Sequence, residues 1–387
     1  MQSTHLREHN LSAILRALAT SSAPTSRAGL AKLTGLTKPT VSKLVEELID
    51  AELVQEGTPL SGGTGRPMVP LQPAEGTLLA IGLEIAADRL SCLGTDLAGR
   101  EIARREVRAD VAAQRPAEVV AQCAELVAAL RAQVPRLPLT GVVAAVPGRI
   151  SPGDGRVLSA PNLGWVDVPF LRALAEREEL AGVGVRAQND NRLSVLTEID
   201  HRPGESFVYV RGSTGVGGAV VLGGTLLDGL HGWAGEFGHT VVAPGGALCR
   251  CGRRGCLEAY ISAHALRSQA GLGPEVPLEG LVDALARSAS RTEVIGTIGR
   301  SLGIAIANAL NVLDLSTVVL SGYLSPIAEE IAPVVRETVE AHALAADIGP
   351  IAIERSDGLA DPALHGAARA ALQPVFEDPG AWIPRLR

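Results

Sequence analysis

Three cysteines within eight residues constrain this chain more than any other feature of its sequence. The segment GEFGHTVVAPGGALCRCGRRGCLE contains His239 and then Cys249, Cys251 and Cys256. Three thiolates and one imidazole form a normal closed, tetrahedral zinc shell. The glycines between these residues let the backbone turn tightly enough to bring closely spaced thiolates to one ion. Because protein donors fill all four positions, we predict a structural Zn²⁺ in the loop 239–256.

The remaining two cysteines are expected to have a different role. Cys92 and Cys123 lie in a strand-like and a helical apolar setting, so we predict that both are buried packing residues. An odd total of five cysteines, three of them close together, also favours a metal site over a disulfide framework.

Length and hydropathy restrict the class of protein. A chain of 387 residues is too long for one ordinary core and predicts two or three domains. No segment approaches the run of about 18 apolar residues that a membrane helix needs. The first ten residues, MQSTHLREHN, lack the basic and apolar regions of a secretory signal. We therefore expect a cytoplasmic protein without a membrane anchor.

The N-terminal region has the pattern of a winged helix-turn-helix. Apolar residues share one helical face over residues 10–19, a second helix is capped by Ser26 and ended by Gly35, and a third begins after Thr37. Two short extended runs around a glycine-rich tip follow, as in a β-hairpin wing. We predict an all-α domain with this wing over residues 1–73.

The third helix has the features of a DNA recognition helix. Its apolar residues share one face, which directs Pro39, Lys43 and Glu46 outward. All three lysines of the chain, at positions 32, 38 and 43, lie in this region, and compact ammonium groups suit phosphate contact. The predicted DNA-binding residues are Lys38, Thr40, Ser42, Lys43 and, at the tip of the wing, Arg66. The alternative is a small helical domain with a solvated charged face.

We predict that the remainder of the chain, residues 74–387, forms a separate α/β domain. Strands mixed with crossover helices occur twice, which predicts two α/β lobes with a cleft between them.

Polar residues near the zinc loop suggest that this domain binds a ligand. Glu236 and Glu258 bracket the loop, and Asn189 and Asp190 follow an apolar run as if at the end of a strand. Carboxylates and amides each bind two sugar hydroxyls, although each of these residues alone is more often a surface group.

A glycine-rich turn gives a weaker signal. The stretch STGVGGAVV, at residues 213–221, follows an apolar strand as phosphate-binding turns do. A tight hairpin is the alternative interpretation of the same residues.

These motifs resemble those of the ROK family (repressors, open reading frames and sugar kinases). The similarity covers essentially the whole chain and lies in VPGRI (146–150), APNLGW (160–165), QND (188–190), STGVGG (213–218), GEFGH (235–239), CRCGRRGCLE (249–258) and VVLSG (318–322). It implies a two-lobed, actin-like (ribonuclease H-like) fold with sugar bound in the cleft. It also implies that sugar hydroxyls are held by Asn189, Asp190, Glu236, His239 and Glu258. His239 would at the same time ligate the zinc, and Asp190 matches the base of the kinase members.

The chain departs from the kinases of this family at one motif. The kinases carry an Asp-x-Gly-Gly-Thr turn for ATP phosphates on the first strand, where this chain has Glu84, Ala86, Ala87 and Asp88. Methyl groups block a close approach of the backbone to phosphate, and Asp88 adds like charge. We therefore expect no kinase activity, and the position of the catalytic base, Asp190, would be vestigial.

The resemblance and the motifs together predict a function. We expect a sugar-responsive transcriptional repressor of the type that responds to xylose or N-acetylglucosamine, with operator DNA and a sugar or sugar phosphate as partners. The sugar is expected to release the DNA, and a homodimer or homotetramer would read paired half-sites. One alternative is a ROK sugar kinase with an appended DNA-binding domain. Another is a constitutive DNA-binding protein with a vestigial sensor domain.

Overall fold

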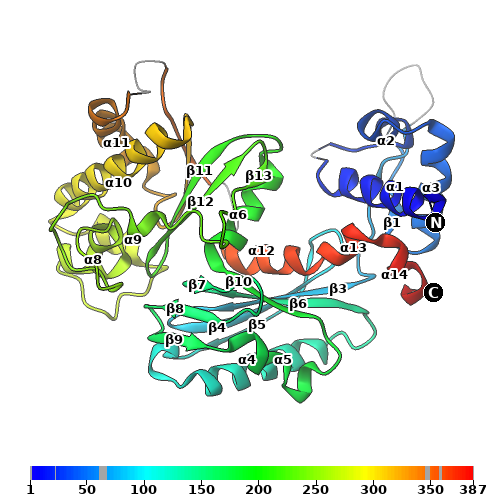
Figure 1. Ribbon diagram of the computed structural model, residues 1–387, viewed down its shortest axis with the longest axis horizontal. Coiled ribbons are helices and arrows are strands. Elements are labelled where there is room, and N and C mark those ends of the chain that lie inside the picture. The colour runs from blue at the N-terminus through cyan, green and yellow to red at the C-terminus, as the bar shows by residue number, and fades with distance from the viewer. Residues whose placement is uncertain (1, 22, 61–67, 345–348, 357–359, 387) are drawn as a thin grey trace. The chain divides into compact units, whose positions relative to one another are not determined.

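The chain folds into two compact units. The computed structural model describes residues 2–21, 23–60, 68–344, 349–356 and 360–386 (Figure 1). The first unit comprises Met1–Val146, Phe170–Gln188 and Leu364–Arg387. The second comprises Pro147–Pro169 and Asn189–Ala363.

The first unit begins with three helices: α1 (Gln2–Ala19), α2 (Arg27–Thr34) and α3 (Lys38–Asp50). The predicted ends of α2 are confirmed, because the Ser26 hydroxyl accepts from the Gly29 amide and Gly35 ends the helix at φ 70°. The Thr37 hydroxyl caps α3 by accepting from the Thr40 amide. Side-chain caps of this kind stabilise a helix start by about 1 kcal/mol each.

Apolar side chains of the three helices form one small core. The buried residues of α3 are Val41, Leu44, Val45 and Leu48, which occupy the single face expected from the periodicity. Leu11, Ile14 and Leu15 of α1 and Leu30 of α2 are fully buried. The α-helical part of the N-terminal region therefore folds as predicted.

A two-stranded antiparallel hairpin follows the helices. It pairs β1 (Val54–Glu56) with β2 (Leu71–Pro73). A further antiparallel bridge joins Leu60 to Met68, so the strands continue toward the tip as a wing does. The tip itself, residues 61–67, lies outside the described residues, and the predicted contact residue Arg66 lies there.

A five-stranded sheet forms the rest of the first unit, in the order β10-β6-β3-β4-β5. Its strands are β3 (Leu79–Ile85), β4 (Arg89–Thr95), β5 (Glu101–Arg108), β6 (Leu139–Val146) and β10 (Val185–Asn189). Strand β3 pairs antiparallel with β4 and parallel with β6. Helix α4 (Pro116–Arg131) packs on one face of this sheet, and α12 (Pro362–Ala371) packs on the other (Figure 1). At Gly82 a Cβ would collide with the backbone of α12, so glycine lets the helix approach the sheet closely.

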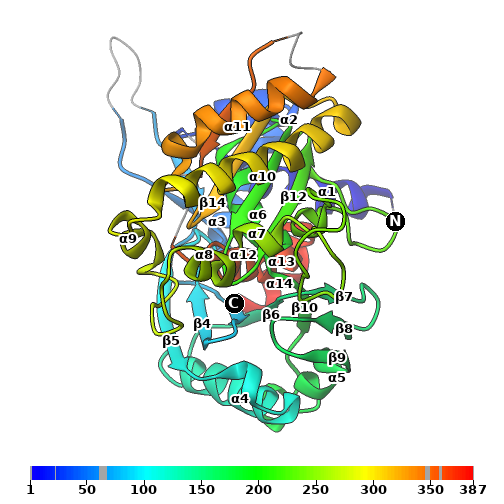
Figure 2. The same ribbon diagram turned by 90° about the vertical axis from the view of Figure 1, so that its left-hand side faces the viewer.

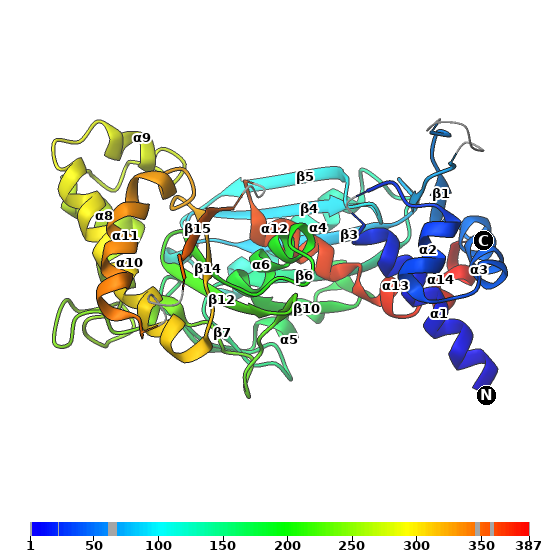
Figure 3. The same cartoon turned by 90° about the horizontal axis from the view of Figure 1, so that it is seen from above.

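The last helices of the chain return to the first one. Helices α13 (Gln373–Glu377) and α14 (Pro379–Leu386) both pack against α1 (Figure 3). The Ser12 hydroxyl donates to the Phe376 carbonyl at 2.6 Å, and Trp382 of α14 is buried. At the end of α12, directly before this segment, the Ala371 carbonyl accepts from the Thr140 hydroxyl at 2.9 Å. The C-terminal segment therefore contacts both the N-terminal helices and the sheet of this unit.

The second unit repeats the strand order of the first. Its sheet has the order β13-β12-β11-β14-β15, built from β11 (Phe207–Gly212), β12 (Val216–Leu222), β13 (Thr225–Leu226), β14 (Thr317–Gly322) and β15 (Ala352–Arg355). Strand β11 pairs antiparallel with β12 and parallel with β14, as β3 does with β4 and β6. The predicted duplication is therefore present in the topology.

Helices cover both faces of the second sheet. Phe207 and Tyr209 of β11 pack with Val195 of α6 (Asp190–His201) on one face. The intervening Val208 and Val210 face the larger core, which includes α10 (Arg291–Leu313) and α11 (Ala328–His342) (Figure 2). This strict alternation is the period-two pattern of a strand buried on both sides.

Several shorter elements complete the molecule. The second unit also contains a three-stranded sheet, β7 (Arg149–Ile150), β8 (Val157–Ala160) and β9 (Trp165–Val168), and the short helices α7 (Glu258–Ile261), α8 (Ala263–Gln269) and α9 (Leu281–Ala286). Helix α5 (Phe170–Ala175) belongs to the first unit. Within the described residues, no helix combines the length and the apolar character that a bilayer crossing requires.

Candidate functional site

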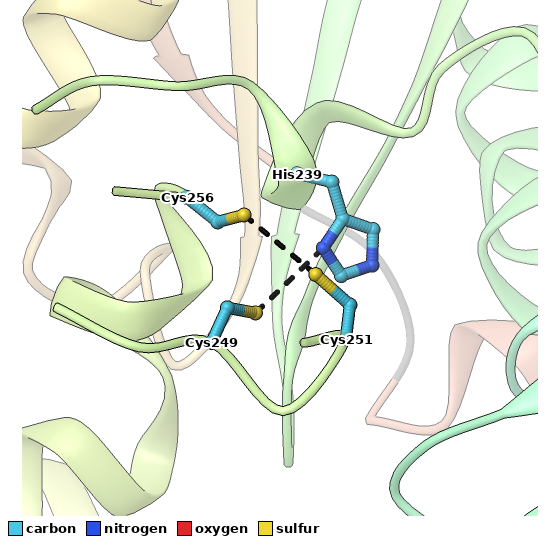
Figure 4. Close-up of side chains that lie close together, drawn as sticks. All are labelled: His239, Cys249, Cys251 and Cys256. Atoms are coloured by element: carbon cyan, nitrogen blue, oxygen red, sulfur yellow. Dashed lines mark hydrogen bonds between the residues drawn. The ribbon is translucent and has the colours of Figure 1, made fainter. Parts of the chain in front are cut away.

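The four predicted metal ligands lie together in the second unit. The ligand atoms of His239, Cys249, Cys251 and Cys256 all lie within 4.8 Å of one another (Figure 4). Cys251 Sγ is 3.8 Å from Cys256 Sγ, and Cys249 Sγ is 3.9 Å from His239 Nδ1. A tetrahedral shell with Zn–S bonds of about 2.3 Å separates its sulfurs by about 3.8 Å. The four donors therefore fit a closed tetrahedral metal site.

Backbone pairing within the loop holds these thiols in place. Isolated antiparallel bridges join Val241 to Cys256 and Leu248 to Arg254, and the Cys249 amide donates to the Arg253 carbonyl at 2.8 Å. Gly255 has φ 80° and its Cβ would collide with the Ala243 carbonyl. A left-handed, crowded position of this kind admits only glycine.

The imidazole of His239 lies between the cysteines and a carboxylate. Its Nδ1 faces Cys249, whereas its Nε2 is 3.9 Å from Glu236 Oε2. The two residues are the two ends of one short turn, because the 3₁₀ helix Phe237–His239 begins directly after Glu236. One ring nitrogen is thus directed to the metal cluster and the other to the predicted sugar-binding residues.

Asn189 and Asp190 begin helix α6. The Asn189 side-chain oxygen accepts from the amides of Asn191 and Arg192, and its Nδ2 donates to the Gly148 carbonyl at 2.9 Å. Asp190 Oδ2 is 3.2 Å from Nη1 of Arg211 on β11. Burial raises the pKa of the Asp190 carboxyl, and the nearby guanidinium opposes that increase.

Glu258 is buried at the start of α7. Its Oε2 accepts from the Val216 amide at 3.0 Å. That carboxylate lies so close to the hairpin between β11 and β12 that a Cβ on Gly215 would collide with it. The glycine-rich turn is therefore a tight hairpin, closed by the Ser213 amide donating to the Gly215 carbonyl, and it positions Glu258.

The pKa of the Glu236 carboxyl responds to three of the other predicted sugar-binding residues. Partial desolvation raises this pKa, although the side chain is 41% exposed. The nearby His239 imidazole and Arg149 guanidinium oppose the increase, and the Asp190 and Glu258 carboxylates add to it. The second unit therefore brings together carboxylates that are up to 68 positions apart in sequence.

Sequence reasoning did not identify three residues beside this site. Arg211 pairs with Asp190, as described above. Arg149 lies over the ring of Trp233 at 5.4 Å, and Trp233 Nε1 donates to the Ile150 carbonyl at 3.1 Å. Trp233 could have been noticed, because the chain has only three tryptophans. The arginines could not, because their partners lie 21 and 84 positions away.

The turn at residues 86–88 makes three backbone hydrogen bonds within the first unit. The Ala86 amide donates to the Arg89 carbonyl at 3.0 Å, and the Ala87 and Asp88 carbonyls accept from the Val111 and Ala109 amides. The Asp88 side chain is more than half exposed, whereas Glu84 on the preceding strand is buried. Of the three amides in this turn, that of Ala86 is thus occupied by a backbone acceptor.

The exposed face of α3 carries cations. Lys38 and Lys43 are exposed, and Thr40 and Ser42 are half-buried beside them. Neither lysine forms an ion pair with any described residue.

Both glutamates of α3 are paired with arginines of the N-terminal region. Arg27 forms ion pairs with Glu46 and with Glu56, and Arg7 forms one with Glu47. The carboxylates nearest the exposed lysines are thus neutralised locally.

The predicted packing role of the two remaining cysteines agrees with their burial. Cys92 on β4 and Cys123 on α4 are both fully buried. Burial raises the pKa of the Cys92 thiol to about 12 and raises that of Cys123 as well. Neither thiol is part of the metal cluster.

Comparison with known proteins agrees with both parts of the chain. The ROK family model matches residues 80–373, and the IclR helix-turn-helix domain model matches residues 10–57. A putative xylose repressor from Caldicellulosiruptor sp. (strain Rt8B.4) is 30% identical over 326 residues, which are 78% of this chain and 79% of the relative.

Two solved structures show the same fold. One is a ROK family transcriptional regulator described as a homologue of the Escherichia coli MLC protein, with a TM-score of 0.75, 23% identity and 99% coverage of both chains. The other is a ROK family glucokinase from Streptomyces griseus in complex with glucose and AMPPNP, with a TM-score of 0.63 and 25% identity. The glucokinase match covers 99% of that chain but only 76% of this one.

The fold and the matched domains define a class of protein: a helix-turn-helix domain joined to an α/β domain of the sugar-kinase type. The predicted fold class is confirmed. The chain belongs to the ROK family.

Proposed function

We propose that this chain is a sugar-responsive transcriptional repressor whose second unit binds the sugar and whose N-terminal helices bind operator DNA. The observation that carries the proposal is the charge arrangement on α3. Lys38 and Lys43 are exposed, whereas Glu46 and Glu47 are each paired with an arginine. A recognition helix needs such a surface, since its N-terminal residues approach base edges and phosphates.

The DNA-binding domain is proposed to comprise residues 1–73 and the ROK domain residues 74–387. The predicted contacts are Lys38, Thr40, Ser42, Lys43 and Arg66. One helix-turn-helix reads a short half-site, so we propose a homodimer or homotetramer on a paired operator. Operator binding also implies that the protein acts in the cytoplasm, with the DNA.

The sugar site is proposed to consist of Asn189, Asp190, Glu236, His239 and Glu258. These residues offer carboxylate and amide groups within one unit, and fixed hydrogen-bonding groups reject ligands that lack a matching hydroxyl. A sugar or sugar phosphate bound there acts as an inducer. A coupling free energy of about 1–3 kcal/mol would change operator affinity by about 5- to 150-fold.

The cluster of His239, Cys249, Cys251 and Cys256 is proposed to hold a structural Zn²⁺. Four protein donors leave no open position for a catalytic water. Because the imidazole is directed toward Glu236, the ion would keep a sugar-binding residue in place.

A sugar kinase is the second candidate. Asp190 occupies the position of the catalytic base, and the glycine-rich hairpin is present. Two observations oppose catalysis: Asp190 is paired with Arg211, and in the turn at residues 86–88 the Ala86 amide is occupied by the Arg89 carbonyl. We therefore propose that the chain is not an enzyme.

Operator binding in the presence and absence of sugars tests the proposal. Purified full-length protein is titrated onto its promoter DNA, and hexoses, pentoses, their phosphates and their disaccharides are added in turn. We expect one carbohydrate to weaken binding at least fivefold. A protein that responds to no carbohydrate contradicts the sensor function, and sugar-dependent ADP release abolished by Asp190→Ala supports the kinase instead.

A further inference from the structure

A pocket of about 290 Å³ lies beside Glu258, outside the other predicted sugar-binding residues. Its walls come from residues 248–250 of the metal loop, from residues 258–269 of α7 and α8, and from Asn162 and Thr214. Glu258 is the one residue that this pocket shares with the proposed sugar site. The volume lies just below the range of about 300–1,000 Å³ that is typical of small-molecule sites.

The chemistry of the walls is mixed. Polar groups include the Asn162 amide, the Thr214 hydroxyl, the His264 imidazole and the Arg250 guanidinium. Apolar surface comes from Ala259, Ala265 and Leu248, and the last of these is 64% exposed. A sugar ring has hydroxyls along its edge and C–H groups on its faces. Its hydroxyls can therefore hydrogen-bond to the polar walls, and its faces can pack against the apolar ones.

A carbohydrate fits these walls better than a phosphate group does. Only one arginine lines the pocket, and the Glu258 carboxylate faces the same space. A buried carboxylate repels an anion, whereas it accepts hydrogen bonds from hydroxyls.

Some of the wall groups are fixed and others are available to a ligand. Glu258 accepts from the Val216 amide at 3.0 Å, and the Asn162 side-chain oxygen accepts from Arg250 at 3.4 Å. The side chains of Thr214, His264 and Ser268 have no hydrogen-bond partner among the described residues. A pre-formed wall with unused donors and acceptors is what a ligand subsite requires.

We propose that this pocket is a second carbohydrate subsite, which holds the sugar linked to the unit bound at Glu258. The inference rests on the proposed function, because it extends the same site. It assigns the effector to the disaccharides rather than the monosaccharides. Glu258 connects the two subsites, since its carboxylate belongs both to the proposed sugar site and to the walls of this pocket.

Calorimetry on the full chain tests this assignment. Glucose, xylose and N-acetylglucosamine are each titrated beside the disaccharides built from them, such as cellobiose, maltose, xylobiose and chitobiose. We expect at least one disaccharide to bind tenfold or more tightly than its constituent monosaccharide. Disaccharides that bind no more tightly than monosaccharides overturn the inference, as does a nucleotide that competes for the pocket.

Two variants assign the gain in affinity to the pocket. Ser268→Trp adds bulk at an exposed wall position on α8 and should reduce the ratio of disaccharide to monosaccharide affinity toward one. His264→Ala removes an unused polar group and should lower the same ratio about fivefold. Thr292→Trp, at an exposed position on α10 away from the pocket, is the matched control and should leave the ratio unchanged.

The outcomes separate this inference from the proposed function. If no carbohydrate of either size binds, the sensor function itself is wrong. If monosaccharides bind and release the operator while disaccharides gain nothing, only the second subsite is wrong. An unchanged ratio in both Ser268→Trp and His264→Ala also contradicts the assignment.

Discussion

The hydroxyl of Ser12 on α1 donates a hydrogen bond to the carbonyl of Phe376 on α13, across 364 positions of sequence. The first helix of the chain is thereby joined to its C-terminal helices. Both belong to the first unit, so this contact lies within a single compact body. The C-terminal helices thereby help to hold α1 in place.

Loss of the C-terminal packing should destabilise the N-terminal helices. Trp382 of α14 is buried, and this helix packs against α1 and α13; truncation of a buried tryptophan to alanine costs about 3–5 kcal/mol. We expect Trp382→Ala to lower the free energy of unfolding by about 3 kcal/mol and to weaken operator binding, as measured by urea titration and gel shift. Ser12→Ala should cost about 1 kcal/mol. Full stability and full operator affinity in Trp382→Ala would contradict this role.

The lysines of α3 should determine the salt dependence of operator binding. Each lysine that neutralises one phosphate contributes about 0.9 to the slope of log K against log salt concentration. We therefore expect Lys43→Ala to weaken binding and to reduce the slope by about one, as measured by fluorescence anisotropy from 50 to 200 mM salt. Arg131→Ala, which removes an exposed cation at the end of α4, is the control and should change neither quantity. An unchanged slope in Lys43→Ala would show that α3 does not contact the phosphates.

Removal of a thiol from the metal cluster should affect both zinc and sugar. We expect one Zn²⁺ per chain by elemental analysis, with a large loss of zinc in Cys251→Ser. Sugar affinity should fall as well, because the imidazole directed to Glu236 loses its metal partner. Cys92→Ala is the matched control: this thiol is buried, its pKa is raised to about 12, and zinc content should stay at one. A Cys251→Ser protein with full zinc and full sugar affinity would refute the site.

The Asp190 carboxyl should make stability depend on pH in a defined direction. Burial raises its pKa in the folded state, so its contribution to stability is complete below the ordinary Asp pKa of about 3.9 and is lost as pH rises through the folded value. The stability of Asp190→Asn relative to the original protein should therefore increase from pH 3.5 to pH 7. Urea titrations of both proteins across this range measure the difference. A difference that is constant with pH, or that falls, contradicts the assignment.

Local features of this chain were predictable from sequence, because they depend on neighbouring residues. Ser26, Gly35 and Thr37 mark helix ends through hydrogen bonds that span only a few positions. The metal cluster was predictable for a similar reason, since three of its four ligands lie within eight residues. The sugar-binding residues needed the family resemblance, because Asp190 and Glu258 are far apart along the chain.

Long-range pairings were not predictable from one sequence. Nothing near Arg211 indicates that it pairs with Asp190, and nothing near Phe376 indicates a contact with Ser12. The pocket beside Glu258 was equally hidden, because its walls come from four separate segments. Such contacts depend on the tertiary fold. It brings together residues that neither the helical nor the strand periodicity of the sequence connects.

The confinement of every lysine to positions 32, 38 and 43 has a consequence for amine chemistry. Apart from the chain terminus, an acylating reagent or an acetyltransferase finds its targets only on α2 and α3, and α3 is the helix that we propose to contact DNA. Acetylation there removes positive charge, so it would silence operator binding while leaving the ROK domain chemically intact. For the same reason, coupling the protein through its amines to a sensor surface would block the face that we propose to contact DNA. Binding studies should immobilise the operator instead.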